Sequence, residues 1–251
     1  MKSTLFLHMG PGLNAHVERQ VLSAHFPEVH FWDQPAVLGP GAFDQLVQSA
    51  LAQVESMYQS TQRPVKLMAH SFGGQLARAI IGRRPELIGD SIFYNAGYCP
   101  ATAFYRLLRR LGQDAQTPGD LKQDIAAFLK LHPQAEINRL WDYVTMVVRD
   151  ANFMRLYWAK QKHFEHYVAL SAGGPTLLFQ TFQDVLNDFY LIRRPAQRLA
   201  WSGRVRLEMG DQDPLIDVQA DASQWGAIFA NLHLVVQPDS GHYSHLEPYF
   251  D

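Results

Sequence analysis

The stretch Ala69-His70-Ser71-Phe72-Gly73-Gly74 follows the apolar run Val65–Ala69 and precedes a segment with apolar residues at helical spacing. This pattern is typical of a buried strand that turns sharply into a helix. A serine at such a turn is held in a strained backbone conformation that directs its hydroxyl out of the sheet. Strand and helix approach closely there, which requires small residues two positions before and after Ser71, and Ala69 and Gly73 meet this requirement. The stretch therefore predicts a nucleophilic serine, the alternative being an ordinary serine in a glycine-rich turn.

Outward from this turn, short apolar runs alternate with amphipathic helical patterns. The predicted strands are Thr4–Met9, His30–Trp32, Val65–Ala69, Ser91–Tyr94, Arg204–Met209 and Leu232–Val236. This alternation predicts an α/β fold whose mostly parallel sheet is covered on both faces. Between Tyr98 and Arg194 the patterns are helical only, and Thr117 is expected to cap one of these helices. We expect a core of residues 1–97 and 196–251, interrupted by a helical insertion at 98–195.

Composition and net charge limit the classes of function that this protein can have. The chain has 251 residues, of which 47% are apolar and 18% charged, enough for one sizeable core with an insertion. A net charge of −2 gives no electrostatic footprint for nucleic acid or an anionic membrane. Its longest apolar runs fall far short of the roughly 20 residues that span a bilayer. No secretory segment is recognisable, and the single Cys99 cannot form an internal disulfide, so we expect a cytoplasmic protein.

Polar residues suited to catalysis follow the last two predicted strands. Gly210-Asp211-Gln212-Asp213-Pro214 comes after Arg204–Met209, and Ser240-Gly241-His242 comes after Leu232–Val236. A serine hydroxyl is a weak nucleophile near neutral pH, so it needs a base, and that base needs an orienting group. The carboxyl ends of parallel strands share one edge of a sheet, where these loops could meet Ser71.

With its serine, acid and histidine in the order Ser71, Asp213, His242, the chain resembles the α/β-hydrolase superfamily. This resemblance implies a hydrolase core with an inserted helical cap and a catalytic triad of these three residues. The acid of the family stands three residues after a glycine, as Asp213 does. Asp211 and Asp217 are then expected to be a turn residue and a helix-capping or solvated residue.

The turn His8–Gly12 resembles the family's H-G-x-P-G loop, with Met9 in place of the first glycine. That loop supplies an oxyanion hole, which needs two N–H donors aimed at the developing charge. By position, the resemblance assigns one donor to the backbone of Phe72 and the other to that of Gly10, with the backbone of Met9 as the alternative to Gly10. Pro11 has no N–H and is excluded.

The predicted insertion is rich in aromatic side chains, more than a small cap needs for its own packing. We expect Met9, Trp141 and Phe182 to bind substrate, with Met146 and Met154 as adaptable apolar wall. The predicted partner is a small molecule, a medium-sized hydrophobic or aromatic carbonyl compound: an ester, thioester, lactone or C–C bond substrate. No cofactor is implied.

Two pairs of histidines stand three residues apart, His163 with His166 and His242 with His245. Further ligands at metal-site spacing are missing from the sequence around them. These histidines, apart from His242, are therefore predicted to be helix-face or solvated residues, and no metal site is predicted.

Three alternatives remain open at this point. Gly10–Ala15 fits G-x-G-x-x-[GA], and Asp33 lies where a dinucleotide-binding fold places its ribose-binding acid, so an oxidoreductase is one alternative. A cofactor-free lyase or cyclase could use Ser71 and His242 only to move protons. A binding protein that merely retains the fold is the third.

Overall fold

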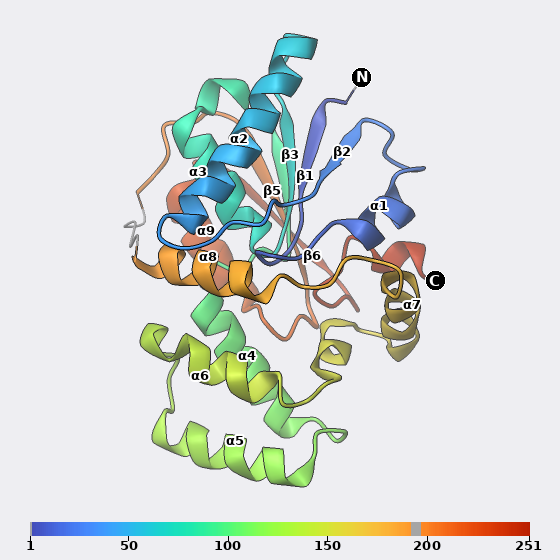
Figure 1. The fold of residues 1–251 in the computed structure, drawn as a ribbon, viewed down its shortest axis with the longest axis vertical. Coiled ribbons are helices and arrows are strands. Elements are labelled where there is room, and N and C mark those ends of the chain that lie inside the picture. Colours follow the sequence, from blue (N-terminus) through green and yellow to red (C-terminus); the bar gives the residue numbers. More distant parts are fainter. Residues whose placement is uncertain (1, 192–196) are drawn as a thin grey trace.

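In the computed structural model, which describes residues 2–191 and 197–251, six parallel strands form one sheet in the order β2-β1-β3-β4-β5-β6 (Figure 1). The strands are β1 (Thr4–Leu7), β2 (Val29–Trp32), β3 (Lys66–His70), β4 (Ser91–Tyr94), β5 (Arg204–Gly210) and β6 (Asn231–Gln237). The helices are α1 (His16–Leu22), α2 (Ala42–Thr61), α3 (Gly73–Arg83), α4 (Pro100–Gln113), α5 (Gly119–Leu131), α6 (Leu140–Val147), α7 (Gln161–Ser171), α8 (Phe179–Leu191) and α9 (Val218–Ile228). The predicted α/β fold with a mostly parallel sheet is confirmed.

Both faces of the sheet are buried, as the near-continuous apolar strands predict. Leu5 and Leu7 of β1 pack into the hydrophobic cluster formed with α2 and α3. Phe6 between them points to the opposite face and joins a second cluster that contains Val17 and Leu22 of α1. Since side chains alternate along a strand, this short apolar run supplies two cores at once.

The chain leaves the sheet after β4 and returns to it with β5, and the described residues between these strands contain helices α4 to α8 (Figure 1). Short 3-10 turns at Ile137–Arg139 and Phe153–Tyr157 join them. In Figure 1, α4, α5 and α6 lie below the sheet, whereas α8 runs between them and α2. The division into a core of residues 1–97 and 196–251 and a cap of residues 98–195 remains a prediction. Its second boundary, between residues 195 and 196, lies outside the described residues.

The start of α5 differs from the predicted one. Thr117 is not the cap of α5, because the helix begins at Gly119 after Pro118 and has no side-chain cap. The Thr117 hydroxyl instead donates a 3.5 Å hydrogen bond to Asp114. None of the described helices combines the length and the apolar character needed to cross a bilayer.

Candidate active site

Ser71 lies between β3 and α3 with a φ of +55°, in the left-handed region that serine rarely adopts. Its backbone N–H donates a 2.9 Å hydrogen bond to the carbonyl of Tyr94 at the end of β4, which holds the turn in place. At Gly73 the helix presses directly on β1, and a Cβ there would overlap the carbonyl oxygen of Leu7. The small residue predicted at this position is therefore a steric requirement.

Two hydrogen bonds join Ser71, His242 and Asp213. The Nε2 atom of His242 lies 2.9 Å from Ser71 Oγ. Its Nδ1 atom lies 2.7 Å from Asp213 Oδ2. A carboxylate can only accept a hydrogen bond, so Nδ1–H donates to Asp213. In the neutral ring Nε2 then accepts a hydrogen bond from the Ser71 hydroxyl. His242 and Asp213 are 1% and 7% exposed, so the hydrogen bond between them is shielded from water, whereas Ser71 is half-buried at the cavity.

Asn95 orients the Asp213 carboxylate. Its side-chain N–H₂ donates to Asp213 Oδ2 at 2.8 Å and to the carbonyl of Gly241 at 3.1 Å. The Ser244 hydroxyl donates to the Asn95 amide oxygen, and the Leu215 N–H donates to the other Asp213 oxygen at 2.8 Å. Asn95 thus connects the end of β4 to the loops that carry the acid and the histidine.

The loop before His242 is held by close backbone contacts. The His242 N–H donates a 2.6 Å hydrogen bond to the carbonyl of Tyr157, in the inserted segment. A Cβ at Gly241 would overlap that same carbonyl, and a Cβ at Gly210 would overlap the carbonyls of Ser240 and Gly241. The Tyr157 ring packs against the imidazole of His242 at 5.1 Å between centroids. These contacts fix the direction of the imidazole.

Glu247 also holds this loop and was missed in the sequence. Its buried carboxylate accepts hydrogen bonds from the N–H groups of Ala159 and Gly241, both at 3.1 Å, and from the Ser240 hydroxyl at 3.3 Å. It thereby ties the turn before His242 to the inserted segment. A glutamate five residues after a histidine carries no recognisable motif, so only the fold reveals this role.

Gly10 and Phe72, the residues expected to supply the two oxyanion donors, both line the cavity beside Ser71. Phe72 is the residue before α3, and its N–H belongs to the free N–H groups at the start of that helix. Gly10 has a φ of +53°, which glycine adopts without strain. Within the described residues neither amide donates a hydrogen bond to the chain, so both can donate to a ligand.

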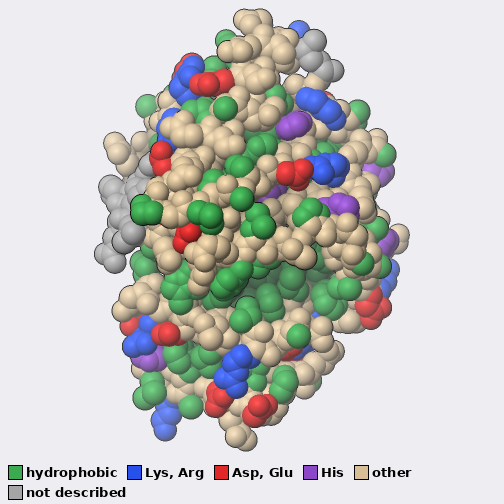
Figure 2. Space-filling view, viewed as in Figure 1, with side chains coloured by type: hydrophobic (Ala, Val, Ile, Leu, Met, Phe, Trp, Pro, Cys, Tyr) green, Lys and Arg blue, Asp and Glu red, His purple; other side chains and the backbone are tan. Residues whose placement is uncertain are grey.

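A cavity of about 180 Å³ opens above Ser71 and His242. Figure 2 shows a recess lined by hydrophobic side chains across this face of the molecule, between the sheet part and the helices below it. Of the residues predicted to bind substrate, Met9 and Phe182 line the cavity. Among the described lining residues there is no Asp, Glu, Lys or Arg.

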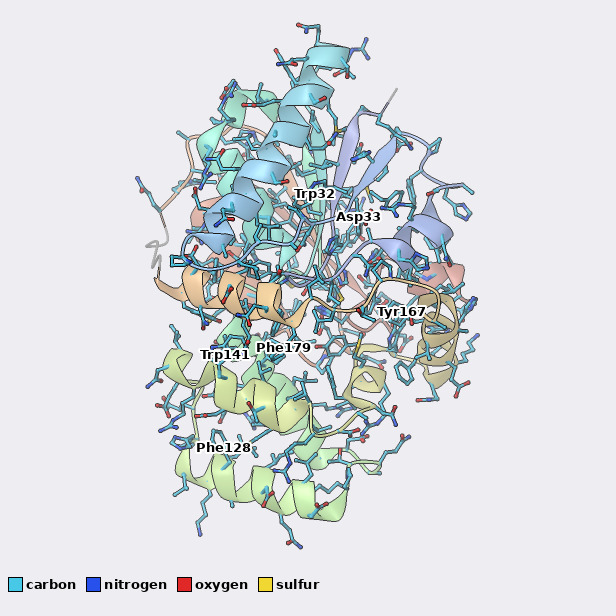
Figure 3. The ribbon with its side chains drawn as sticks, viewed as in Figure 1. Trp32, Asp33, Phe128, Trp141, Tyr167 and Phe179 are labelled. Carbon is cyan, nitrogen blue, oxygen red and sulfur yellow. The ribbon has the colours of Figure 1, made fainter. Side chains whose placement is uncertain are left out.

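The sequence also predicts Trp141 to bind substrate, but this residue is not among the described residues that line the cavity. Its ring packs behind Phe182 at 5.9 Å, and its Nε1–H donates to Asn187 at 2.7 Å. Figure 3 shows Trp141 and Phe179 between α6 and α8. Trp141 therefore supports the aromatic wall from outside. Of the two predicted methionines, Met154 lines the cavity and Met146 does not.

The aspartates considered as alternatives in the sequence, Asp211 and Asp217 for the triad acid and Asp33 for a ribose-binding acid, have structural roles. The Asp217 side chain accepts from the N–H of Ala220 and caps α9, and Asp211 accepts from the N–H of Ser240. Asp33 forms a 2.5 Å ion pair with Arg19.

The glycine-rich turn offers little room for a dinucleotide. The backbone of Leu178 covers Gly12 and donates a 2.9 Å hydrogen bond to its carbonyl, and a Cβ at Gly12 would meet the Leu178 carbonyl oxygen at 2.5 Å. A pyrophosphate needs this approach to the turn, since it binds the turn's backbone. The structure therefore does not favour the dinucleotide alternative.

The chain belongs to the alpha/beta hydrolase family, whose model matches residues 5–250. Similar solved structures include a proline iminopeptidase-related protein from Thermus thermophilus, with 19% identity, a TM-score of 0.68 and coverage of 99% of this chain and 86% of that one.

Another is 2-hydroxy-6-oxo-6-phenylhexa-2,4-dienoate hydrolase from Rhodococcus sp. strain RHA1, with 16% identity, a TM-score of 0.62 and coverage of 99% and 86%. A monoacylglycerol lipase from Paleococcus ferrophilus has 12% identity, a TM-score of 0.54 and coverage of 95% and 85%. At these identities the likeness shows the fold alone. None of the curated proteins compared with the chain matches it significantly.

The role of Asn95 can be tested with Asn95→Gly. Asn95 has a φ of +47°, which glycine accepts freely, so this change removes the hydrogen bonds without adding backbone strain. Losing a donor to a buried carboxylate costs about 1–3 kcal/mol. We expect a fluorophosphonate to modify Ser71 about tenfold or more slowly in this variant. Gln62→Gly, at an exposed residue with a φ of +53°, is the matched control and should label at the wild-type rate. Equal rates in the two variants would contradict the assigned role.

Proposed function

We propose that this protein is a serine hydrolase that transfers an acyl group from a hydrophobic carbonyl compound to water. The observation that carries the proposal is the continuous hydrogen-bonded chain from buried Asp213 through His242 to the strained Ser71, with bonds of 2.7 Å and 2.9 Å. A serine, a base and an orienting acid in this geometry form a catalytic triad on several unrelated folds.

In the proposed reaction, His242 Nε2 takes the Ser71 proton as Oγ attacks the carbonyl carbon. The imidazolium that forms is stabilised by the Asp213 carboxylate, which also keeps the proton on Nδ1. His242 then gives its new proton to the leaving group, which departs and leaves an acyl group on Ser71. Water, deprotonated by His242, attacks this ester and releases the acid and the free serine.

Negative charge develops on the carbonyl oxygen in both tetrahedral intermediates. The proposed donors to it are the N–H groups of Gly10 and Phe72. Both residues line the cavity beside Ser71, and neither amide has a partner among the described residues. In comparable sites, one such donor contributes about 3–4 kcal/mol to transition-state stabilisation. Because both donors belong to the backbone, they are positioned by the fold and do not depend on the side chain at Met9.

The proposed substrate is an uncharged, mostly apolar acyl compound. The cavity wall consists of side chains such as Phe104, Phe153, Phe182, Leu186 and Leu215, and it offers no counter-ion among its described residues. A charged acyl group would lose its hydration there without gaining a partner, which is unfavourable. Apolar acyl and aryl groups instead gain from leaving water, at about 25 cal/mol per Å² of buried surface.

The role of Asp213 predicts a specific loss of turnover. Asp213→Asn keeps the volume of the side chain but removes the charge that stabilises the imidazolium and fixes its tautomer. By analogy with other triads, hydrolysis of a p-nitrophenyl ester should fall on the order of 10⁴-fold, while the circular dichroism spectrum stays unchanged. Asp211→Asn and Asp217→Asn are the matched controls and should remain within a few-fold of wild type. A wild-type rate in Asp213→Asn, or the large loss in a control instead, would refute the assignment.

The substrate class can be tested with a pair of methionine variants. Met154 lines the cavity and Met146 does not, although both are half-buried in the inserted segment. Met154→Trp should fill part of the cavity and lower kcat/KM for octanoyl and benzoyl esters about tenfold relative to the acetyl ester. Met146→Trp should leave this ratio unchanged. A wild-type enzyme that prefers acetyl or charged acyl groups would contradict the proposed substrate class.

A further inference from the structure

A buried cluster of titratable side chains lies behind the candidate active site, formed by Glu18 of α1, His70 of β3 and His245 of the C-terminal turns. Glu18 Oε1 is 3.8 Å from His70 Nδ1 and 3.9 Å from His245 Nε2. One oxygen or nitrogen atom from each residue lies within 4.8 Å of the others. The sequence predicts His245 to be on a helix face or solvated, and this is wrong, because its side chain is 2% exposed.

The hydrogen bonds of the cluster leave it with unpaired acceptors. His70 Nε2 lies 2.9 Å from the backbone carbonyl oxygen of His242, which can only accept, so Nε2 carries the proton. In neutral His70, the Nδ1 lone pair then faces the Glu18 carboxylate, another acceptor. His70 Nδ1 and both ring nitrogens of His245 are buried without a hydrogen-bond partner in the described part of the chain. The lone pairs of Glu18 and His70 therefore face each other, and His245, which carries a proton on one ring nitrogen when neutral, adds a further lone pair without a partner.

Burial makes an ion at this point favourable. Glu18, His70 and His245 are all buried, and the ion-pair contacts of Glu18 within the described residues are with these two histidines. A buried carboxylate without a cation is unfavourable.

We propose that Glu18, His70 and His245 form a binding site for a divalent transition metal ion, with zinc the best match. Two imidazoles and one carboxylate are a common ligand set for zinc, with bonds of about 2.0–2.2 Å. Ligand atoms on a tetrahedral ion then lie about 3.3–3.4 Å apart. On such an ion the two Glu18 separations of 3.8 Å and 3.9 Å would shrink by about 0.5 Å each, and the pair His70 and His245, which lies within 4.8 Å, by up to about 1.4 Å.

The surroundings of His70 support this assignment. Metal-bound histidines usually donate their second ring N–H to a carbonyl or carboxylate, which orients the ring. His70 does so toward the carbonyl of His242. A metal here would tie α1, the turn before Ser71 and the C-terminal segment to one point. None of the three ligands is among the described residues that line the substrate cavity. The proposed metal ion therefore does not contact substrate, and its role is to hold Ser71 and His242 at their positions relative to each other.

The test is zinc binding by the full-length protein after treatment with a chelator. We expect one zinc ion per chain in equilibrium dialysis with elemental analysis, and a rise in Tm of about 5 °C or more at saturating zinc. Glu18→Gln keeps the side-chain volume but removes the charge, so it should weaken binding at least tenfold and abolish the rise in Tm. Glu28→Gln and His233→Asn, at exposed residues, are the matched controls and should bind as wild type.

Two further measurements separate this site from the active site and from misfolding. Ser71→Ala and His242→Ala should retain the zinc ion. If His242→Ala instead lost the zinc ion while Glu18→Gln retained it, the proposal would be overturned. If Glu18→Gln does not fold, X-ray absorption of zinc-loaded wild type decides, with two imidazoles and one carboxylate expected and fewer than two imidazoles contradicting it. Absence of stoichiometric binding would also overturn it. Ester hydrolysis is not used as a readout, so the result is independent of the proposed function.

Discussion

The hydrogen bond between Ser71 Oγ and His242 Nε2 joins two turns that are 171 residues apart in the chain, and much of the structure serves to hold its two ends. On one side, α3 packs closely against β1 at Gly73, two residues after the serine in its left-handed conformation. On the other side, Asn95, Glu247 and Tyr157 fix the loop of the histidine through side-chain and backbone contacts. Neither end is positioned by its own residues alone.

The parallel sheet explains why these turns meet. Strands β3, β4, β5 and β6 are neighbours with the same direction, so the loops after them open on one edge. The inserted helices then cover that edge and supply an apolar wall. Tyr157 contributes both to the position of His242 and to the cavity wall. Its carbonyl accepts a hydrogen bond from the His242 N–H, and the residue also lines the cavity. The orientation of the His242 imidazole and the apolar wall of the cavity therefore depend on the same inserted segment.

The sequence predicts the sheet, the serine turn and the positions of Asp213 and His242, because each depends on a local pattern of apolar periodicity, glycine or strand ends. It does not predict Asn95 or Glu247, since an amide or a carboxylate acquires its role only from partners far along the chain. Glu18, His70 and His245 are missed for the same reason. Trp141 is misplaced because an aromatic residue at helical spacing gives no indication of which face meets the cavity and which supports it.

Covalent capture of the acyl-enzyme tests the central claim most directly. Wild-type protein mixed with a benzoyl ester, quenched within milliseconds and digested, should carry the added mass of one benzoyl group on the peptide that contains Ser71. The amount should rise in a burst before steady turnover, because the acyl group leaves only by attack of water. Turnover without any acylated peptide would instead indicate a reaction in which Ser71 and His242 only move protons. Acylation of another residue would contradict the account outright.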